Sequence, residues 1–164
     1  MRHLWSLLLF CALFFSVTVA AQPLVADSVQ ADSVTGHDIV EKAKEFLGVP
    51  YRYGCMNPKK GFDCSGFTTY VYRSLDIQLT RTSRSQIKDG VRIEDRRDLQ
   101  AGDLVFFTGT RSKKTIGHVG IVTEVDEHTG EFEFIHAGRG GICINSSSDG
   151  YYDRRYVGAC RVLV

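Results

Sequence analysis

Apolar residues recur at two different periods along this chain, helical in the first half and strand-like in the second. The helical spacing predicts one helix from Thr35, its N-cap, to about Leu47. It predicts a second helix that Cys64 begins and for which Asp63 is a good N-cap. A short further turn of helix is expected within residues 82–89.

The second half of the chain predicts strands. One run is continuously apolar, as in a central strand, and another alternates polar and apolar residues with period two. The predicted strands cover residues 104–107, 119–125, 131–136, 142–144 and 157–164. Helices followed by an antiparallel meander indicate an α+β fold, with N-terminal helices packed on a five- to six-stranded, mostly antiparallel sheet.

The N-terminus has the pattern of an export signal. Residues 1–21 begin with a positive charge, continue as an apolar run and end in small residues, as secretory signal peptides do. A membrane anchor is the alternative, but the run is short for a span of about 20 residues; lipid attachment at Cys11 is disfavoured by the bulky residue before it. We expect a flexible lead-in over 22–35, one domain over 36–164, and an exported protein, periplasmic or secreted, without stable membrane insertion after cleavage.

The composition indicates a globular domain, and the net charge gives information about its binding partners. The chain has 164 residues, of which 43% are hydrophobic and 24% charged, as expected for one globular domain with a substantial core. Its formal net charge is only +1, so bulk charge gives no reason to expect a nucleic acid or another polyanion as partner.

Four cysteines would remain after cleavage: Cys55, Cys64, Cys143 and Cys160. An oxidising compartment permits disulfides, and four cysteines allow three full pairings. Cys143 and Cys160 both fall in strand-like segments and could pair, although a buried free thiol is at least as good an interpretation of each. If Cys64 is a nucleophile, it must stay free.

Cys64 is a candidate nucleophile because a helix N-terminus carries partial positive charge, which favours the thiolate. Two histidines could assist it. Residues 126–130 form a turn signal, so a hairpin is expected. A turn centred at 127 places His118 opposite His136, and one centred at 128 places Gly120 opposite His136; both registers put the two histidines on one face. A shift of half a residue would separate them.

These three residues suit covalent catalysis. Cys64 would attack, His118 would accept its proton, and His136 would orient His118, since a neutral imidazole can accept an Nδ1–H hydrogen bond. The alternatives are a buried structural cysteine and core histidines. A zinc site is less well supported, because no Cys-x-x-Cys or His-x-x-x-His pair accompanies the three residues. We therefore expect no metal and no other cofactor.

Five segments that occur in order also carry a family resemblance. They are YRYG at 51–54, DCSGF at 63–67, GDLVFF at 102–107, GHVGI at 117–121 and IHA at 135–137. The chain resembles the NlpC-type cell-wall cysteine peptidases, which have a papain-like fold, from about Ile39 to the C-terminus. The resemblance implies hydrolysis of peptidoglycan stem peptides or muropeptides, usually at the bond between D-γ-glutamate and a diamino acid such as meso-diaminopimelate.

The resemblance also implies roles for single residues. Cys64, His118 and His136 match the nucleophile, the base and the third member of the triad. Tyr51 matches a tyrosine that assists the oxyanion hole, with Tyr53 close enough in sequence to leave that choice open. Asp63 and Ser65 match residues that contact the free N-terminal ammonium of a stem peptide in some relatives, but Asp63 could instead be only the helix cap.

Two features set this chain apart from the family pattern. Cys55 follows Gly54 where the family usually has a second glycine, so it could narrow the cleft or, less plausibly, pair with Cys64. The basic loop 110–115 could face acidic stem carboxylates, although a solvated loop is the simpler interpretation. An amidase or acyltransferase with the same triad, and a non-catalytic wall-binding module, are the competing functions. We expect a monomer.

Overall fold

The computed structural model describes residues 33–110 and 112–163. The expected signal peptide and most of the lead-in lie outside these residues. The helices are α1 (Gly36–Lys44), α2 (Cys64–Arg73), α3 (Ser83–Gln86), the 3₁₀ helix η1 (Arg96–Asp98) and α4 (Gly150–Asp153). The strands are β1 (Met56–Asn57), β2 (Gly61–Phe62), β3 (Val91–Ile93), β4 (Leu104–Thr108), β5 (Ile116–Val125), β6 (Phe132–Gly138), β7 (Gly141–Ser146) and β8 (Tyr156–Arg161).

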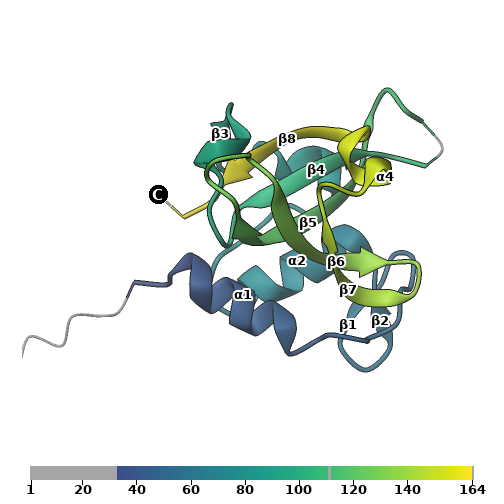
Figure 1. Cartoon of the computed structure of the whole chain (residues 1–164). Coiled ribbons are helices and arrows are strands. Elements are labelled where there is room, and N and C mark those ends of the chain that lie inside the picture. The colour runs from purple at the N-terminus through teal and green to yellow at the C-terminus, as the bar shows by residue number, and fades with distance from the viewer. Residues whose placement is uncertain (1–32, 111, 164) are drawn as a thin grey trace, which may run out of the picture. The chain divides into compact units, whose positions relative to one another are not determined.

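The main sheet confirms the predicted α+β class. It has six antiparallel strands in the order β3-β8-β4-β5-β6-β7. Strands β4 to β7 form the expected meander. The last strand was expected to continue that meander, but β8 returns to pair with β4 instead, so β4 has a partner on each side. Helices α1 and α2 lie together on one side of this sheet (Figure 1).

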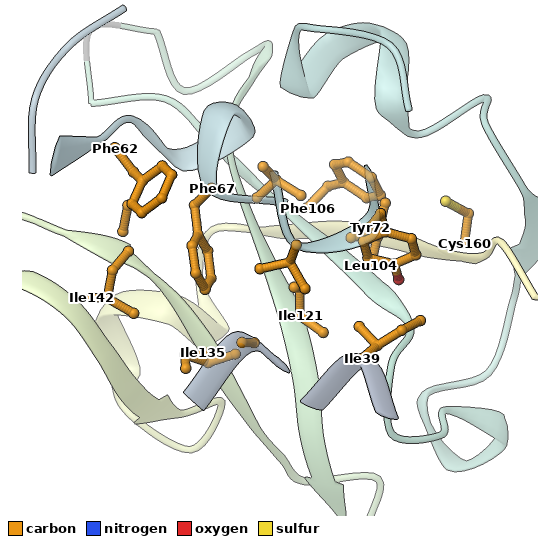
Figure 2. Packing of buried hydrophobic residues seen from close by; sticks show 14 residues of the cluster. Ile39, Phe62, Phe67, Tyr72, Leu104, Phe106, Ile121, Ile135, Ile142 and Cys160 are labelled. Carbon is orange, nitrogen blue, oxygen red and sulfur yellow. The ribbon is translucent and has the colours of Figure 1, made fainter. Parts of the chain in front are cut away.

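The continuous apolar run of β4 reflects burial on both faces of the sheet. Leu104 and Phe106 belong to the large core beneath α1 and α2, while Val105 and Phe107 belong to a second cluster on the opposite face. Figure 2 shows side chains from α1, α2 and the strands meeting in the large core. Such two-sided burial excludes water from both sides of the central strands, which gives the site a rigid support.

Local signals explain the helix boundaries. Thr35 forms the predicted cap of α1, and Asp38 completes a capping box with it. The helix ends at Lys44, three residues earlier than predicted, because the chain continues in turns to Gly48, which has a φ of +82°. The short strands β1, β2 and β3 were not predicted, since two or three residues are too few to show a period.

None of the helices in the described ranges has both the length and the apolar character needed to cross a bilayer. The described part of the chain from residue 33 onward belongs to one compact unit.

Candidate active site

Cys64 is the first residue of α2, as the sequence predicts. Asp63 is the N-cap, and its Oδ1 accepts a hydrogen bond of 2.6 Å from the backbone N–H of Gly66. A Cβ at Gly66 would lie 2.4 Å from the carbonyl oxygen of Cys55, so only glycine allows the loop before α2 to approach this closely. The cap and the glycine together fix the turn from which the thiol projects.

The two histidines come from neighbouring strands. Strand β5 pairs with β6 so that Ile121 lies opposite Ile135, which corresponds to the predicted register centred at 128 near the site. A bulge between Val122 and Glu124 shifts the register by one residue further along the hairpin. His118 and His136 therefore share a face of the sheet, as expected.

The histidines form a direct hydrogen bond. His118 Nε2 lies 2.8 Å from His136 Nδ1, and the two rings are nearly perpendicular, at 88°. The orienting bond was expected at Nδ1 of His118, and this detail is wrong. His118 uses Nε2 toward His136, so its Nδ1 takes no part in this hydrogen bond.

His136 makes further hydrogen bonds through Nε2, the ring nitrogen that does not contact His118. Its Nε2 lies 2.9 Å from Asn145 Oδ1 and 3.3 Å from the hydroxyl of Tyr152. Because an amide oxygen can only accept, His136 carries its proton on Nε2 and keeps Nδ1 bare. His118 must then donate from Nε2, which leaves Nδ1 as a proton acceptor. The chain from Asn145 to His118 thus selects the tautomer that a general base needs.

Burial sets the protonation of the two histidines. It lowers the pKa of His118 to about 3, with smaller contributions from His136 and the positive Arg155. Burial also lowers the pKa of His136, and the hydrogen bond that His136 donates to Asn145 opposes this by raising the pKa. Both rings are consequently neutral near pH 7, as the hydrogen-bond chain requires.

The pKa of the Cys64 thiol is raised, whereas the helix N-terminus alone would lower it. Burial raises its pKa above the ordinary value, and the nearby charge of Asp63 adds to this. Backbone N–H groups of Ser65, Val119 and Cys64 itself oppose the shift by favouring the thiolate. At rest a neutral thiol and a neutral imidazole therefore line the same cavity, so proton transfer to His118 would have to accompany any attack of the sulfur on a substrate.

Cys64, His118 and His136 line one cavity of about 510 Å³. Tyr51 also lines it, whereas Tyr53 does not and is 89% exposed. Burial, followed by the proximity of Cys64, raises the pKa of the Tyr51 hydroxyl, so it stays protonated and can donate a hydrogen bond. The geometry favours Tyr51 over Tyr53 as an oxyanion donor.

Asp63 and Ser65 both contact Arg81. The guanidinium makes two hydrogen bonds to Asp63, of 3.0 and 2.7 Å, and one of 2.9 Å to Ser65 Oγ. Arg81 is in turn followed by α3, whose buried Gln86 bonds the carbonyl oxygen of Ser65. Segment 81–86 therefore braces the first turn of α2.

The described cysteines are free thiols. Cys143 lies in β7 and Cys160 in β8, and three strands separate these two in the sheet, so the considered pairing between them does not form. Cys55 does not line the cavity, and it is not paired with Cys64. Among the described residues of the loop 110–115, which exclude residue 111, only Thr110 lines the cavity, while Lys113 and Lys114 are exposed.

The sequence analysis missed Asn145 and Tyr152. The signal for Asn145 was present, because Gly140 and Gly141 mark a turn that places Cys143 opposite His136. Asn145 then follows two residues later on the same face. Tyr152 lies in the four-residue helix α4, which shows no recognisable pattern.

Comparison with known proteins agrees with this arrangement. The murein DD-endopeptidase MepH of Escherichia coli (strain K12) is 38% identical over 150 residues, which cover 88% of this chain and 52% of that protein. The gamma-D-glutamyl-L-lysine dipeptidyl-peptidase of Bacillus cereus is 36% identical over 129 residues, covering 77% and 36%. The chain thus spans about half or less of the length of these relatives.

A solved structure supports the fold. The crystal structure of an NlpC/P60 family protein from Bacillus cereus superposes with a TM-score of 0.70 and 34% identity, covering 80% of this chain and 41% of that one. Residues 48–161, which include Asp63, Cys64 and both histidine strands, match the NlpC/P60 family. This protein belongs to the NlpC/P60 family.

Proposed function

We propose that this protein is a peptidoglycan endopeptidase that uses Cys64 as its nucleophile. One observation carries the proposal: Cys64, His118 and His136 line a single cavity, and the two histidines are hydrogen bonded in the order that a base and its orienter require. A wall-binding module without catalysis would need neither the linked histidines nor a thiol at a helix N-terminus.

The names of the relatives support the substrate. Both are called peptidases, one of murein and one of a gamma-D-glutamyl-L-lysine bond. We propose the D-γ-glutamyl bond to a diamino acid, such as meso-diaminopimelate, as the site of cleavage. The DD cross-link is the second candidate, because the relative that is 38% identical is named a DD-endopeptidase.

Acylation follows from the protonation states. Cys64 Sγ transfers its proton to Nδ1 of His118 as sulfur attacks the amide carbon. His136 stabilises the resulting imidazolium through the hydrogen bond at Nε2. The C–N bond then breaks, His118 returns the proton to the leaving amine, and the acyl group remains on sulfur as a thioester.

Deacylation restores the enzyme. Water attacks the thioester carbon while His118 Nδ1 accepts a proton from it. The C–S bond breaks, the peptide leaves as a carboxylic acid, and sulfur regains a proton from His118. In both steps the backbone N–H of Cys64 and the hydroxyl of Tyr51 would donate to the oxyanion, which is where such donors contribute most.

We also propose that the protein is exported from the cytoplasm. Residues 1–21 carry the signal-peptide pattern, and peptidoglycan lies outside the cytoplasmic membrane. We propose that the mature protein begins near Gln22 and acts as a monomer in the periplasm or the medium.

Digestion of purified muropeptides and intact sacculi, read by mass spectrometry, tests the function. The wild-type protein should give fragments cut after γ-D-glutamate, and Cys64→Ala should give none. Cys55→Ser is the matched control and should retain activity, because its side chain does not line the cavity. Masses that report separation of cross-linked peptides would assign the DD bond instead. Cleavage of neither substrate by the wild type would contradict the proposed function.

A further inference from the structure

Arg155 is a cationic side chain of the cavity that the reaction steps above do not use. It lines the cavity and is half-buried. None of the ion pairs among the described residues includes it. The residues that line the cavity within the described chain also include no aspartate or glutamate. Because charges that are partly removed from water are usually paired, this guanidinium is suited to a carboxylate that enters the cavity with a substrate.

The guanidinium of Arg155 is held through one of its nitrogens. Its Nη1 lies 3.0 Å from the hydroxyl oxygen of Tyr151 and 3.5 Å from the carbonyl oxygen of Thr108. Its Cζ lies 4.4 Å from the centre of the Tyr151 ring, which fixes the plane of the group. The hydrogen bonds that the side chain makes within the described residues use Nη1 alone, so the N–H groups of Nε and Nη2 remain for a ligand. Two parallel N–H groups of this kind can bind a carboxylate bidentately.

The position of Arg155 beside the proposed base indicates which part of the substrate it would meet. Its carbonyl oxygen accepts a hydrogen bond of 2.8 Å from the backbone N–H of Thr108, at the end of β4. The residue before Thr108 is Phe107, which lies opposite His118 in β5. The charge of Arg155 is close enough to help lower the pKa of His118. Because His118 must protonate the leaving amine, the amino acid that carries this amine has to lie on the Arg155 side of the cavity.

Both candidate bonds release an amine of this kind. In the D-γ-glutamyl bond and in the DD cross-link alike, the leaving amine belongs to the diamino acid. The side chain of meso-diaminopimelate ends in a second carboxylate, which forms no peptide bond. We propose, on the basis of the function above, that Arg155 binds this carboxylate and is a specificity-determining residue for diamino acids that carry it. An amide at that place has no charge, and a lysine side chain ends in an ammonium, which Arg155 would repel.

Two matched substrates test the proposal in the wild-type protein. Both are cross-linked muropeptide dimers that contain both candidate bonds; the side-chain carboxylates of meso-diaminopimelate are free in one and amidated in the other. We expect kcat/KM to be about tenfold or more higher for the free dimer, because hydrogen bonds between charged groups are the strong ones. Equal values for the two dimers would overturn the proposal while leaving the endopeptidase function intact. Cleavage of neither dimer, together with intact sacculi, would contradict the function itself and the proposal with it.

Arg155→Gln adds a readout that a purely structural role would not move. It should lower kcat/KM for the free dimer about tenfold and leave that for the amidated dimer within about twofold, so that the preference disappears. Arg155→Lys keeps the charge without the paired N–H groups and should retain part of the preference. Arg154→Gln is the matched control, because Arg154 is exposed, does not line the cavity and should leave the preference unchanged.

Equal losses on the two dimers in a folded Arg155→Gln protein would overturn the role of Arg155 in recognition. The comparison of the two dimers in the wild type decides whether the carboxylate is recognised even if this variant does not fold.

Discussion

His136 Nε2 and Asn145 Oδ1 lie 2.9 Å apart, on adjacent strands of the sheet. This contact adds one residue to the proposed triad, because it determines which nitrogen of His136 carries the proton. Through the 2.8 Å bond to His118 it also determines which nitrogen of the base is free. The tautomer of His118, the proposed base, is therefore set by an asparagine two hydrogen bonds away.

We expect Asn145→Ala to lower kcat by about tenfold or more with little change in KM, because the wrong tautomer of a catalytic imidazole is costly. Asn145→Asp should retain more activity, since it keeps an acceptor, and should move the acid limb of the pH profile to higher pH by stabilising protonated His136. Steady-state kinetics on a muropeptide across pH would show both effects. Asn57→Ala, in β1 outside the cavity, is the matched control. Equal rates for Asn145→Ala and the wild type would show that Tyr152 or another group orients His136.

The parts of this fold that the sequence predicts are those that a local pattern determines. The cap at Asp63, the start of α2 at Cys64 and the shared face of His118 and His136 all follow from spacing within one or two elements. The antiparallel pairing of β8 with β4 does not, because it joins residues about 50 positions apart and depends on which edge of the sheet remains open.

The chemistry of the site was predicted less completely than its position. A helix N-terminus favours the thiolate, but the structure adds burial, which raises the pKa of Cys64 and outweighs that effect. The bonds that Arg81 makes to Asp63 were equally inaccessible, since 18 residues separate the two and no periodicity links them. Both are consequences of packing.

Tyr51→Phe removes only a hydroxyl from the cavity. If that hydroxyl donates to the oxyanion, kcat should fall by about 10- to 100-fold while KM changes little, because the interaction forms only in the transition state. Tyr53→Phe is the matched control, since Tyr53 is 89% exposed and does not line the cavity. Kinetics of the two variants on one muropeptide would distinguish them. Loss of affinity without loss of kcat in Tyr51→Phe would assign Tyr51 to substrate binding.

Gly120 lies against the β6 backbone near His136. A Cβ at this position would be 2.7 Å from Phe134 Cδ2, 3.1 Å from the carbonyl oxygen of Ile135 and 3.2 Å from His136 Cβ, so Gly120→Ala must displace the Phe134 ring and crowds the backbone beside His136. We expect reduced kcat, and destabilisation of about 1–3 kcal/mol, as for overpacked cores. Gly140→Ala is the matched control, because a Cβ there has no atoms within 4 Å. Urea unfolding and kinetics measured together would test this; wild-type values for Gly120→Ala in both would contradict it.

The two histidines, one buried and one half-buried, should make stability depend on pH. Folding lowers the pKa of His118 from its ordinary 6.5 to about 3, so between these values the unfolded chain binds more protons than the folded one. The free energy of unfolding should therefore fall as the pH falls below about 6.5, at up to about 1.4 kcal/mol per pH unit for one such group. His136, whose pKa is also lowered, should add in the same direction.

Urea unfolding at several pH values between 7 and 4.5 would measure this slope, and that range avoids most carboxylate titration. His118→Asn should make the dependence shallower, because it removes the group that must stay neutral in the folded protein. His128→Asn, in the exposed turn between β5 and β6, should leave the slope as in the wild type. A wild-type stability that stays constant from pH 7 to 4.5 would show that His118 is hydrated enough to titrate normally. The imidazole would then be partly protonated near pH 6, and proton transfer from Cys64 would lose its acceptor there.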